Sequence, residues 1–151
     1  MFTAGRYLAS SALLLLALGC ATSQDIVANP GVTGRQYKSA YLVAHNDKSA
    51  DVDAAIQREL FRRGIAVSSG PDGKQPPEAD LIVKYADSWS WDVTMYLVSL
   101  DIQMFDAKSG NLVATAKWKN SAMHGWHGLE SVVSDLVGGM FTKLGISAKI
   151  S

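Results

Sequence analysis

Residues 79–118 alternate between apolar and polar side chains through three successive segments, and this alternation limits the fold more than any other feature of the chain. A period of two places every second side chain on the same face of a β-strand. Asp106 and Gly110 bound a turn between the second and third segments, as in a tight hairpin. The pattern therefore predicts three antiparallel strands that bury only one face. The predicted buried positions are Leu81, Val83, Tyr85, Trp89 and Trp91, then Tyr96, Val98, Leu100, Ile102 and Met104, then Leu112, Ala114, Ala116 and Trp118.

Two segments outside this region show the 3.6-residue periodicity of an amphipathic helix. The first begins at a cap on Ser49 or Asp51 and ends near Gly64, a residue type suited to the end of a helix. The second covers residues 129–144 and stops at Gly145. The apolar positions are Val52, Ala55, Ile56 and Leu60 in the first helix and Leu129, Val132, Val133, Leu136, Val137, Met140 and Leu144 in the second.

Two shorter segments complete the predicted fold. Residues 38–45 have the apolar density of a buried strand, and residues 65–67 form a short strand before the Gly- and Pro-rich loop 68–78. A strand, a helix and a second strand in this order normally make a right-handed parallel crossover. The chain is therefore predicted to be an α+β protein, a β-α-β-β-β-α two-layer sandwich with two helices on one face of a mixed sheet.

The N-terminal segment has the layout of an export signal. Arg6 precedes an apolar run, residues 7–18, and Gly19 and Cys20 follow it. The run is too short to span a bilayer. The segment resembles the signal peptide of bacterial lipoproteins, which is cut before a cysteine. This resemblance implies that residues 1–19 are removed and that Cys20 becomes the acylated, palmitate-bearing first residue of the mature chain.

An alternative interpretation is ordinary secretion. Ala17 and Gly19 also satisfy the small-x-small cleavage rule, and Ala17 stands where lipoprotein signals usually have leucine. Ordinary secretion, however, would leave the single thiol of the chain, on Cys20, without an internal disulfide partner. Lipidation explains it better, and two or more acyl chains hold a protein to a membrane essentially permanently. In lipoproteins of enteric-type bacteria an aspartate after the cysteine retains the protein at the inner membrane. Ala21 and Thr22 follow here and favour the outer membrane, on the periplasmic side.

The mature chain is expected to have one folded domain. Residues 20–37 carry Ser, Thr, Asn, Pro and Gly with little periodicity, and are interpreted as a lipidated N-terminus with a flexible tether. Residues 38–151 are long enough for a single α+β periplasmic domain with a core of its own. Removal of Arg6 with the leader leaves 13 basic and 14 acidic residues. This nearly neutral balance argues against a nucleic-acid partner.

The order of elements, together with the N-terminal signal, resembles a family of small periplasmic lipoproteins. This group includes the lipopolysaccharide-assembly lipoprotein of the outer membrane and several lipoprotein families of unknown function. The resemblance covers about residues 38–146 and is clearest in segments 78–85 and 101–113. Backbone geometry alone would also select Asp and Gly for the turn in the second segment. No binding residue of the family carries over to this sequence.

The sequence holds no recognisable catalytic constellation. Its histidines are His45, His124 and His127, its thiol is committed to lipid, and it lacks a Gly-x-Ser-x-Gly elbow and a phosphate-binding glycine loop. We therefore expect a protein that is not an enzyme and that uses no cofactor. A hydrolytic alternative would require His45, His124 and a carboxylate to converge in space.

The weak metal candidates are His124 and His127. Two imidazoles three residues apart can meet one ion on a helical turn, but their glycine-rich surroundings favour a polar loop, and we predict no metal site. The acidic residues Asp51 and Asp53 are better explained as helix-start residues, which the helix dipole favours, than as calcium ligands.

Four tryptophans, Trp89, Trp91, Trp118 and Trp126, fall near the predicted sheet's end or in the loop before the last helix. They define a candidate partner-binding patch for a protein, glycan or lipid. Tryptophans at alternating strand positions also commonly fill a core, and this alternative stays open. The expected function is a membrane-anchored, non-enzymatic scaffold that binds an envelope protein partner in cell-envelope assembly or maintenance. A carrier or sensor of a small apolar or glycan ligand is the alternative.

Overall fold

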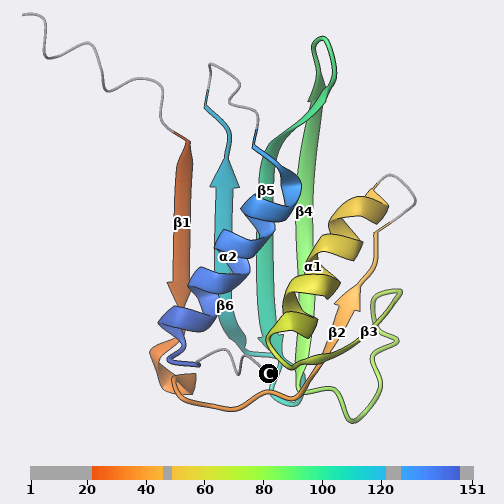
Figure 1. The fold of residues 1–151 in the computed structure, drawn as a ribbon. Helices are drawn as coiled ribbons and strands as arrows, with labels where there is room; N and C mark the ends of the chain where they lie inside the picture. Colours follow the sequence, from red (N-terminus) through yellow and green to blue (C-terminus); the bar gives the residue numbers. More distant parts are fainter. Residues whose placement is uncertain (1–21, 46–48, 122–126, 147–151) are drawn as a thin grey trace, which may run out of the picture.

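The computed structural model describes residues 22–45, 49–121 and 127–146. These residues form one mixed sheet of six strands in the order β1-β6-β5-β4-β2-β3, with helices α1 and α2 on one face (Figure 1). The predicted α+β sandwich is confirmed. The elements are β1 Ser23–Ala28, the 3-10 turn η1 Pro30–Val32, β2 Ser39–Val43, α1 Ala50–Arg62, β3 Ala66–Gly70, β4 Leu81–Trp91, β5 Met95–Asp106, β6 Leu112–Lys119 and α2 Leu129–Lys143.

The β-α-β unit forms as the sequence predicts. Strand β2 runs parallel to β3 on one side and to β4 on the other, and α1 makes the crossover between β2 and β3. Each helix is followed by a glycine with positive φ, 78° at Gly64 and 68° at Gly145, a conformation that other residues adopt only with strain. The helix boundaries could therefore be predicted from local sequence.

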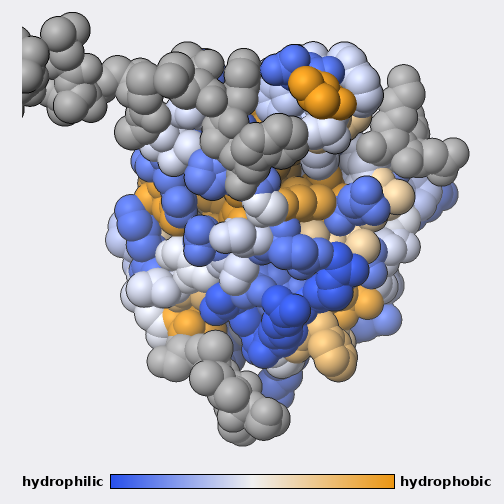
Figure 2. All heavy atoms as spheres, turned by 45° about the horizontal axis from the view of Figure 1, so that its top comes forward, coloured by the Kyte–Doolittle hydropathy of each residue, from blue (hydrophilic) through white to orange (hydrophobic). Residues whose placement is uncertain are grey.

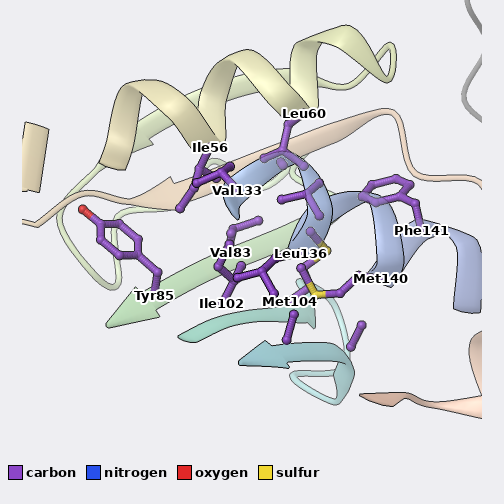
Figure 3. Close-up of a cluster of buried hydrophobic side chains, with 14 of the residues drawn as sticks. Ile56, Leu60, Val83, Tyr85, Ile102, Met104, Val133, Leu136, Met140 and Phe141 are labelled. Atoms are coloured by element: carbon purple, nitrogen blue, oxygen red, sulfur yellow. The ribbon is translucent and has the colours of Figure 1, made fainter. Parts of the chain in front are cut away.

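The core lies between the helices and the sheet, and Figure 3 shows it in section. Side chains from α1, α2 and the four inner strands interlock there, because every second strand residue and one stripe of each helix are apolar. Burying such side chains is the main source of stability for a domain of this size. The side chains labelled in the figure are Ile56, Leu60, Val83, Tyr85, Ile102, Met104, Val133, Leu136, Met140 and Phe141.

Two β-bulges change which residues of β5 and β6 face the core. The pairing of β4 with β5 shifts between Ser88 and Trp89, so Leu97 is buried, whereas Tyr96 and Val98 are not, as the strict alternation had wrongly predicted. A second shift, after Met104, buries Val113 and leaves Leu112 exposed. A single extra residue reverses the face of every side chain beyond it up to the next irregularity.

Strand β1 lies within the segment expected to be a flexible tether. It pairs antiparallel with β6 from Ser23↔Lys119 to Ala28↔Ala114 and forms one edge of the sheet. Its three apolar residues, Ile26, Val27 and Ala28, are consecutive and do not alternate with polar ones, so periodicity did not reveal the strand. The strand is held by its backbone pairing and by Ile26, which packs on the core next to α2. Lys143 of α2 also donates to the carbonyl oxygen of Ile26.

The contact between β1 and α2 depends on a glycine. A Cβ added at Gly139 would overlap Cδ1 of Ile26, whereas one added at Gly138 would lie 3.0 Å from the guanidinium of Arg63, which is ion-paired with Glu59. The two neighbouring glycines therefore differ in what they permit. Gly139 allows close packing of helix on strand, and Gly138 faces α1.

We expect Gly139→Ala to destabilise the protein by about 1–2 kcal/mol, because overpacking costs roughly 1–3 kcal/mol and the gain in helix propensity returns less than about 1 kcal/mol. Gly138→Ala is the matched control and should cost less, because its added Cβ lies 3.0 Å from the guanidinium of Arg63 and does not overlap it. Urea unfolding measures both effects, and faster amide hydrogen exchange in β1 should accompany Gly139→Ala alone. Equal stability of the two variants would contradict this account of Gly139.

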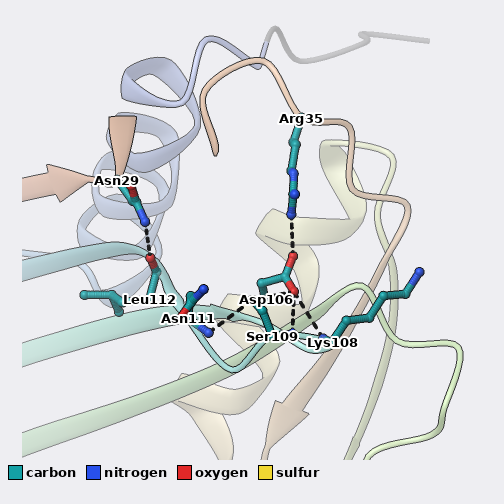
Figure 4. A network of polar contacts seen from close by, with 7 residues as sticks. All are labelled: Asn29, Arg35, Asp106, Lys108, Ser109, Asn111 and Leu112. Carbon is teal, nitrogen blue, oxygen red and sulfur yellow. Dashed lines mark hydrogen bonds and ion pairs between the residues drawn. The ribbon is translucent and has the colours of Figure 1, made fainter. Parts of the chain in front are cut away.

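Asp106, the last residue of β5, binds both the hairpin turn that follows it and the segment before β2 (Figure 4). One carboxylate oxygen accepts hydrogen bonds from the backbone N–H of Lys108 and from the N–H and hydroxyl of Ser109, at 2.8–3.2 Å. The other oxygen forms an ion pair of 2.8 Å with Arg35. The hydrogen bonds from Ser109, first of all the one from its backbone, lower the pKa of Asp106. The predicted hairpin turn is thus also the attachment point of the chain that follows β1.

Candidate functional site

The structure places the predicted tryptophan patch in three different environments. Trp118 is buried, with 6% of its surface exposed, and belongs to the core. Trp89 is half-buried against the same core, and its Nε1 donates to Asp87 at 2.6 Å. Trp91 is 68% exposed. Trp126 lies outside the described residues. The core alternative therefore holds for Trp118, and Trp91 is the described tryptophan that offers a surface.

The exposed tryptophan belongs to a projecting hairpin. Trp91 pairs with Met95 across the turn, and Val93 lies between them; these three side chains are 68%, 53% and 85% exposed. We call residues Trp91–Met95 the hairpin tip. Figure 1 shows the hairpin of β4 and β5 extending beyond the ends of the other strands. Figure 2 shows hydrophobic atoms at this projecting end beside hydrophilic ones, whereas hydrophilic atoms dominate the outer side of the helices.

The exposure of the tip follows from the lengths of the elements. Trp91 and Met95 continue the face of Trp89 and Leu97, which is the core face of the sheet, because side chains two residues apart share a face. Leu129, the first residue of α2, packs beside Trp89, so the helix layer ends there and the two strands continue past it. The apolar face is therefore uncovered at the tip. The predicted patch included Trp91 but not Val93 or Met95. The only signal for these two residues in the sequence is that they are apolar and lie beside a turn.

A hollow of about 370 Å³ lies at the base of the tip. Its size and its lining of aromatic, aliphatic and amide groups suit a small ligand. The side-chain amide of Asn120 donates to the carbonyl of Leu97 at 3.0 Å. The lining residues are Trp89, Met95, Tyr96, Leu97, Asn120, His127, Gly128 and Leu129.

His127 takes part in an aromatic contact. Its ring meets Trp118 edge-on, with 5.6 Å between centroids and 75° between planes. His124, the other weak metal candidate, lies outside the described residues. Among the residues whose positions are described, no three His, Cys, Asp or Glu side chains converge in a way that would hold a metal ion.

A polar network joins the start of α1 to β4. The hydroxyl of Ser49 donates to the carboxylate of Asp87 at 3.0 Å instead of capping its own helix, and the indole of Trp89 donates to the same carboxylate. Asp87 interrupts the apolar face of β4, and these two donors explain how it is tolerated there. The network fixes the ring of Trp89 at the base of the tip.

His45 and Tyr85 contact each other beside this network. The ring of His45 stacks on Tyr85, with 4.4 Å between centroids. The hydroxyl of Tyr85 donates to Asp53 at 2.7 Å, and burial, followed by the bond to Asp53, raises the pKa of Tyr85. Ser49 donates to the carboxylate of Asp87 and not to an imidazole. His124, which the hydrolytic alternative requires, lies outside the described residues.

Comparison with known proteins identifies the fold but no family. No protein-family model matches the chain, and no curated protein matches it. Among solved structures, it is similar to the PelC dodecamer from Paraburkholderia phytofirmans, with 19% identity and a TM-score of 0.58 over 84% of this chain and 99% of that one. A single-residue variant of PelC matches at a TM-score of 0.57 with the same identity, over 83% and 98% of the two chains.

A minor lipoprotein from Acinetobacter baumannii also matches, with 14% identity over 73% of this chain and 92% of that one. Its TM-score of 0.38 is too low to support an argument. At these identities the likenesses concern the fold alone. Within the described part of the chain, no helix is both long enough and apolar enough to cross a membrane.

Proposed function

We propose that this protein is a lipid-anchored periplasmic lipoprotein of the outer membrane, and that it acts as a non-enzymatic scaffold subunit in the cell envelope. In this proposal Cys20 carries the lipid, and the folded domain recruits its partners at the membrane surface. The observation that carries the proposal is the position of Cys20, which follows an apolar leader and precedes the first strand by only three residues.

The short spacing between Cys20 and β1 favours a scaffold over a carrier. Residues 20–23 span at most about 11 Å when fully extended, because each residue contributes no more than about 3.6 Å. A domain held this closely cannot sweep far from the bilayer to collect or deliver a ligand. The hollow at the base of the tip therefore supports the carrier or sensor alternative less well than its volume suggests.

The sheet offers a route to self-assembly. Within the described residues β1 pairs only with β6, and β3 pairs only with β2, so both edges of the sheet leave backbone groups available for a neighbouring strand. PelC, which shares the fold, is a dodecamer. We infer that this chain also forms a homo-oligomer, in which the scaffold is built from copies of itself.

Replacement of the anchor cysteine tests the membrane placement. We expect the wild-type protein, expressed with its leader in an enteric-type bacterium, to float with outer-membrane vesicles and to show added acyl mass. Cys20→Ser should abolish both the added mass and flotation. Ala21→Asp is the matched control, because it keeps the cysteine and, by the sorting pattern of lipoproteins, should move the protein to the inner membrane.

The same preparations test the scaffold. Sedimentation of the detergent-solubilised lipoprotein should give a mass several times that of one chain. A monomer at every concentration would contradict self-assembly, and an unmodified Cys20 in the exported wild-type protein would contradict the anchor.

A further inference from the structure

The hairpin tip and the start of β1 lie at the same end of the sheet. Ser23 pairs with Lys119, Lys119 pairs with Ser99, and Ser99 pairs with Ser88 of β4. These four residues form one row across the strands. β1 runs away from that row into the domain, whereas β4 runs beyond it to the tip. The chain that leads back to Cys20 therefore joins the domain at the end from which the hairpin projects (Figure 1).

The chain between Ser23 and Cys20 is about as long as the part of the hairpin that extends beyond this row. The four residues that follow Ser88, from Trp89 to Asp92, extend the tip about 13 Å beyond the row, at roughly 3.3 Å per residue. The three residues from Ser23 back to Cys20 reach at most about 11 Å. An acylated Cys20 in an upright domain can therefore enter a bilayer only if the tip also arrives at its surface.

The composition of the tip suits the interface of a membrane. A tryptophan has an apolar body and a polar N–H and favours the headgroup level, and Val93 and Met95 supply exposed apolar area beside it. Asp92, at the turn, keeps the insertion shallow, because a carboxylate is costly within the hydrocarbon region.

We propose that the hairpin tip, Trp91–Met95, is a second membrane contact that inserts into the lipid headgroup region next to the lipid on Cys20. This inference rests on the proposed function, since it takes Cys20 as the anchor. The tip and the anchor are separated by the three strand spacings from β1 to β4, about 14 Å. Two attachments at this separation hold the strands roughly along the membrane normal. The Asp106 turn then faces away from the membrane.

The test measures whether Trp91 contacts lipid. The full lipidated protein is reconstituted into vesicles of phosphatidylethanolamine and phosphatidylglycerol, and brominated phosphatidylcholine, whose bromine atoms quench tryptophan, is then introduced. We expect the wild-type fluorescence to fall and Trp91→Phe to lose most of this quenching. The variant keeps an aromatic ring at an exposed position, so it should fold normally.

A matched control moves the reporter to the other end of the molecule. Phe61 is 75% exposed in the last turn of α1. This end of the helix lies at the opposite end of the domain from the tip (Figure 1). Phe61→Trp in the Trp91→Phe background restores the number of tryptophans and should not restore quenching. Restored quenching at position 61 would overturn the proposed orientation.

The remaining outcomes separate this inference from the proposed function. Vesicles that float with acylated protein, while wild type and Trp91→Phe are quenched equally, would overturn the tip contact and leave the anchor intact. Protein that does not float and carries an unmodified Cys20 would overturn both. Quenching that depends on Trp91 in floating vesicles supports both.

Discussion

Trp118→Ala should lower the free energy of unfolding by about 3–5 kcal/mol, as expected when a large aromatic side chain is removed from a packed core. Trp118 is 6% exposed, and His127 packs against its edge. Ala116 is next to it on the core face of β6, and the fully buried Leu100 pairs with it on β5. Neighbours that are already closely packed relax only partly into the space. The variant should therefore retain a cavity, and at this cost many domains of this size are close to unfolding.

Trp91→Ala is the matched comparison. It removes the same side chain from a strand that lies in the same sheet, but from a position that is 68% exposed, so the free energy of unfolding should change by less than about 0.5 kcal/mol. Urea unfolding monitored by circular dichroism measures both variants without relying on tryptophan emission. A similar loss of stability in the two variants would show that the tip is packed in solution.

Asp106→Ala should produce the second largest loss, about 2–3 kcal/mol, because each hydrogen bond to a charged acceptor contributes roughly 1.5–3 kcal/mol and such contributions are not additive. The substitution leaves the N–H groups of Lys108 and Ser109 and the guanidinium of Arg35 without their acceptor. It should also loosen the chain between η1 and β2, which the ion pair with Arg35 holds against the turn. Urea unfolding measures the loss, and faster hydrogen exchange near Arg35 should accompany it.

The pKa of Asp106 gives this prediction a pH signature. Its pKa in the folded protein is lowered, so the stabilisation is present above the ordinary value of 3.8 and is lost as the pH falls below it through the folded pKa. Backbone hydrogen bonds from Lys38 and Ser39 lower the pKa of Asp80 in the same way. The wild-type protein should therefore lose stability steeply below about pH 4.

Asp106→Asn should reduce that steepness, since the amide does not titrate. Asp92→Asn, at the exposed hairpin turn, serves as the control and should leave the pH profile unchanged. Unfolding midpoints measured from about pH 2 to about pH 6 distinguish the variants, because this range brackets the ordinary pKa values of carboxyl groups. A wild-type slope that persists in Asp106→Asn would assign the acid sensitivity to other carboxylates.

Local sequence predicted the helices, the crossover and the meander. The reason is that helix periodicity, strand alternation and glycine at the helix ends each express a preference within a few residues. Val52, Ile56 and Leu60 are buried on α1 as their spacing indicates, and Gly64 ends that helix with the positive φ predicted for it. The polar turn at Asp106 also forms where its residue types placed it.

The candidate site was only partly predictable. Alternation assigned Trp89, Trp91 and Trp118 to one face, and that assignment agrees with the strand pairing. The alternation of side chains does not indicate how far the helix layer extends along that face. This length separates a buried Trp118 from an exposed Trp91, and it depends on where α2 begins relative to strands more than 30 residues away in the sequence.

The sequence by itself determined the fold class and the helix boundaries, because each is a local pattern of side chains. Only the tertiary structure decided that Ser23–Ala28 is a strand, that two bulges reverse the faces of β5 and β6, and that the hairpin tip projects beside the start of β1. These features come from pairing between distant segments. These features depend on backbone hydrogen bonds and on the close contact of Ile26 with Gly139. Such interactions leave no periodic pattern in the sequence.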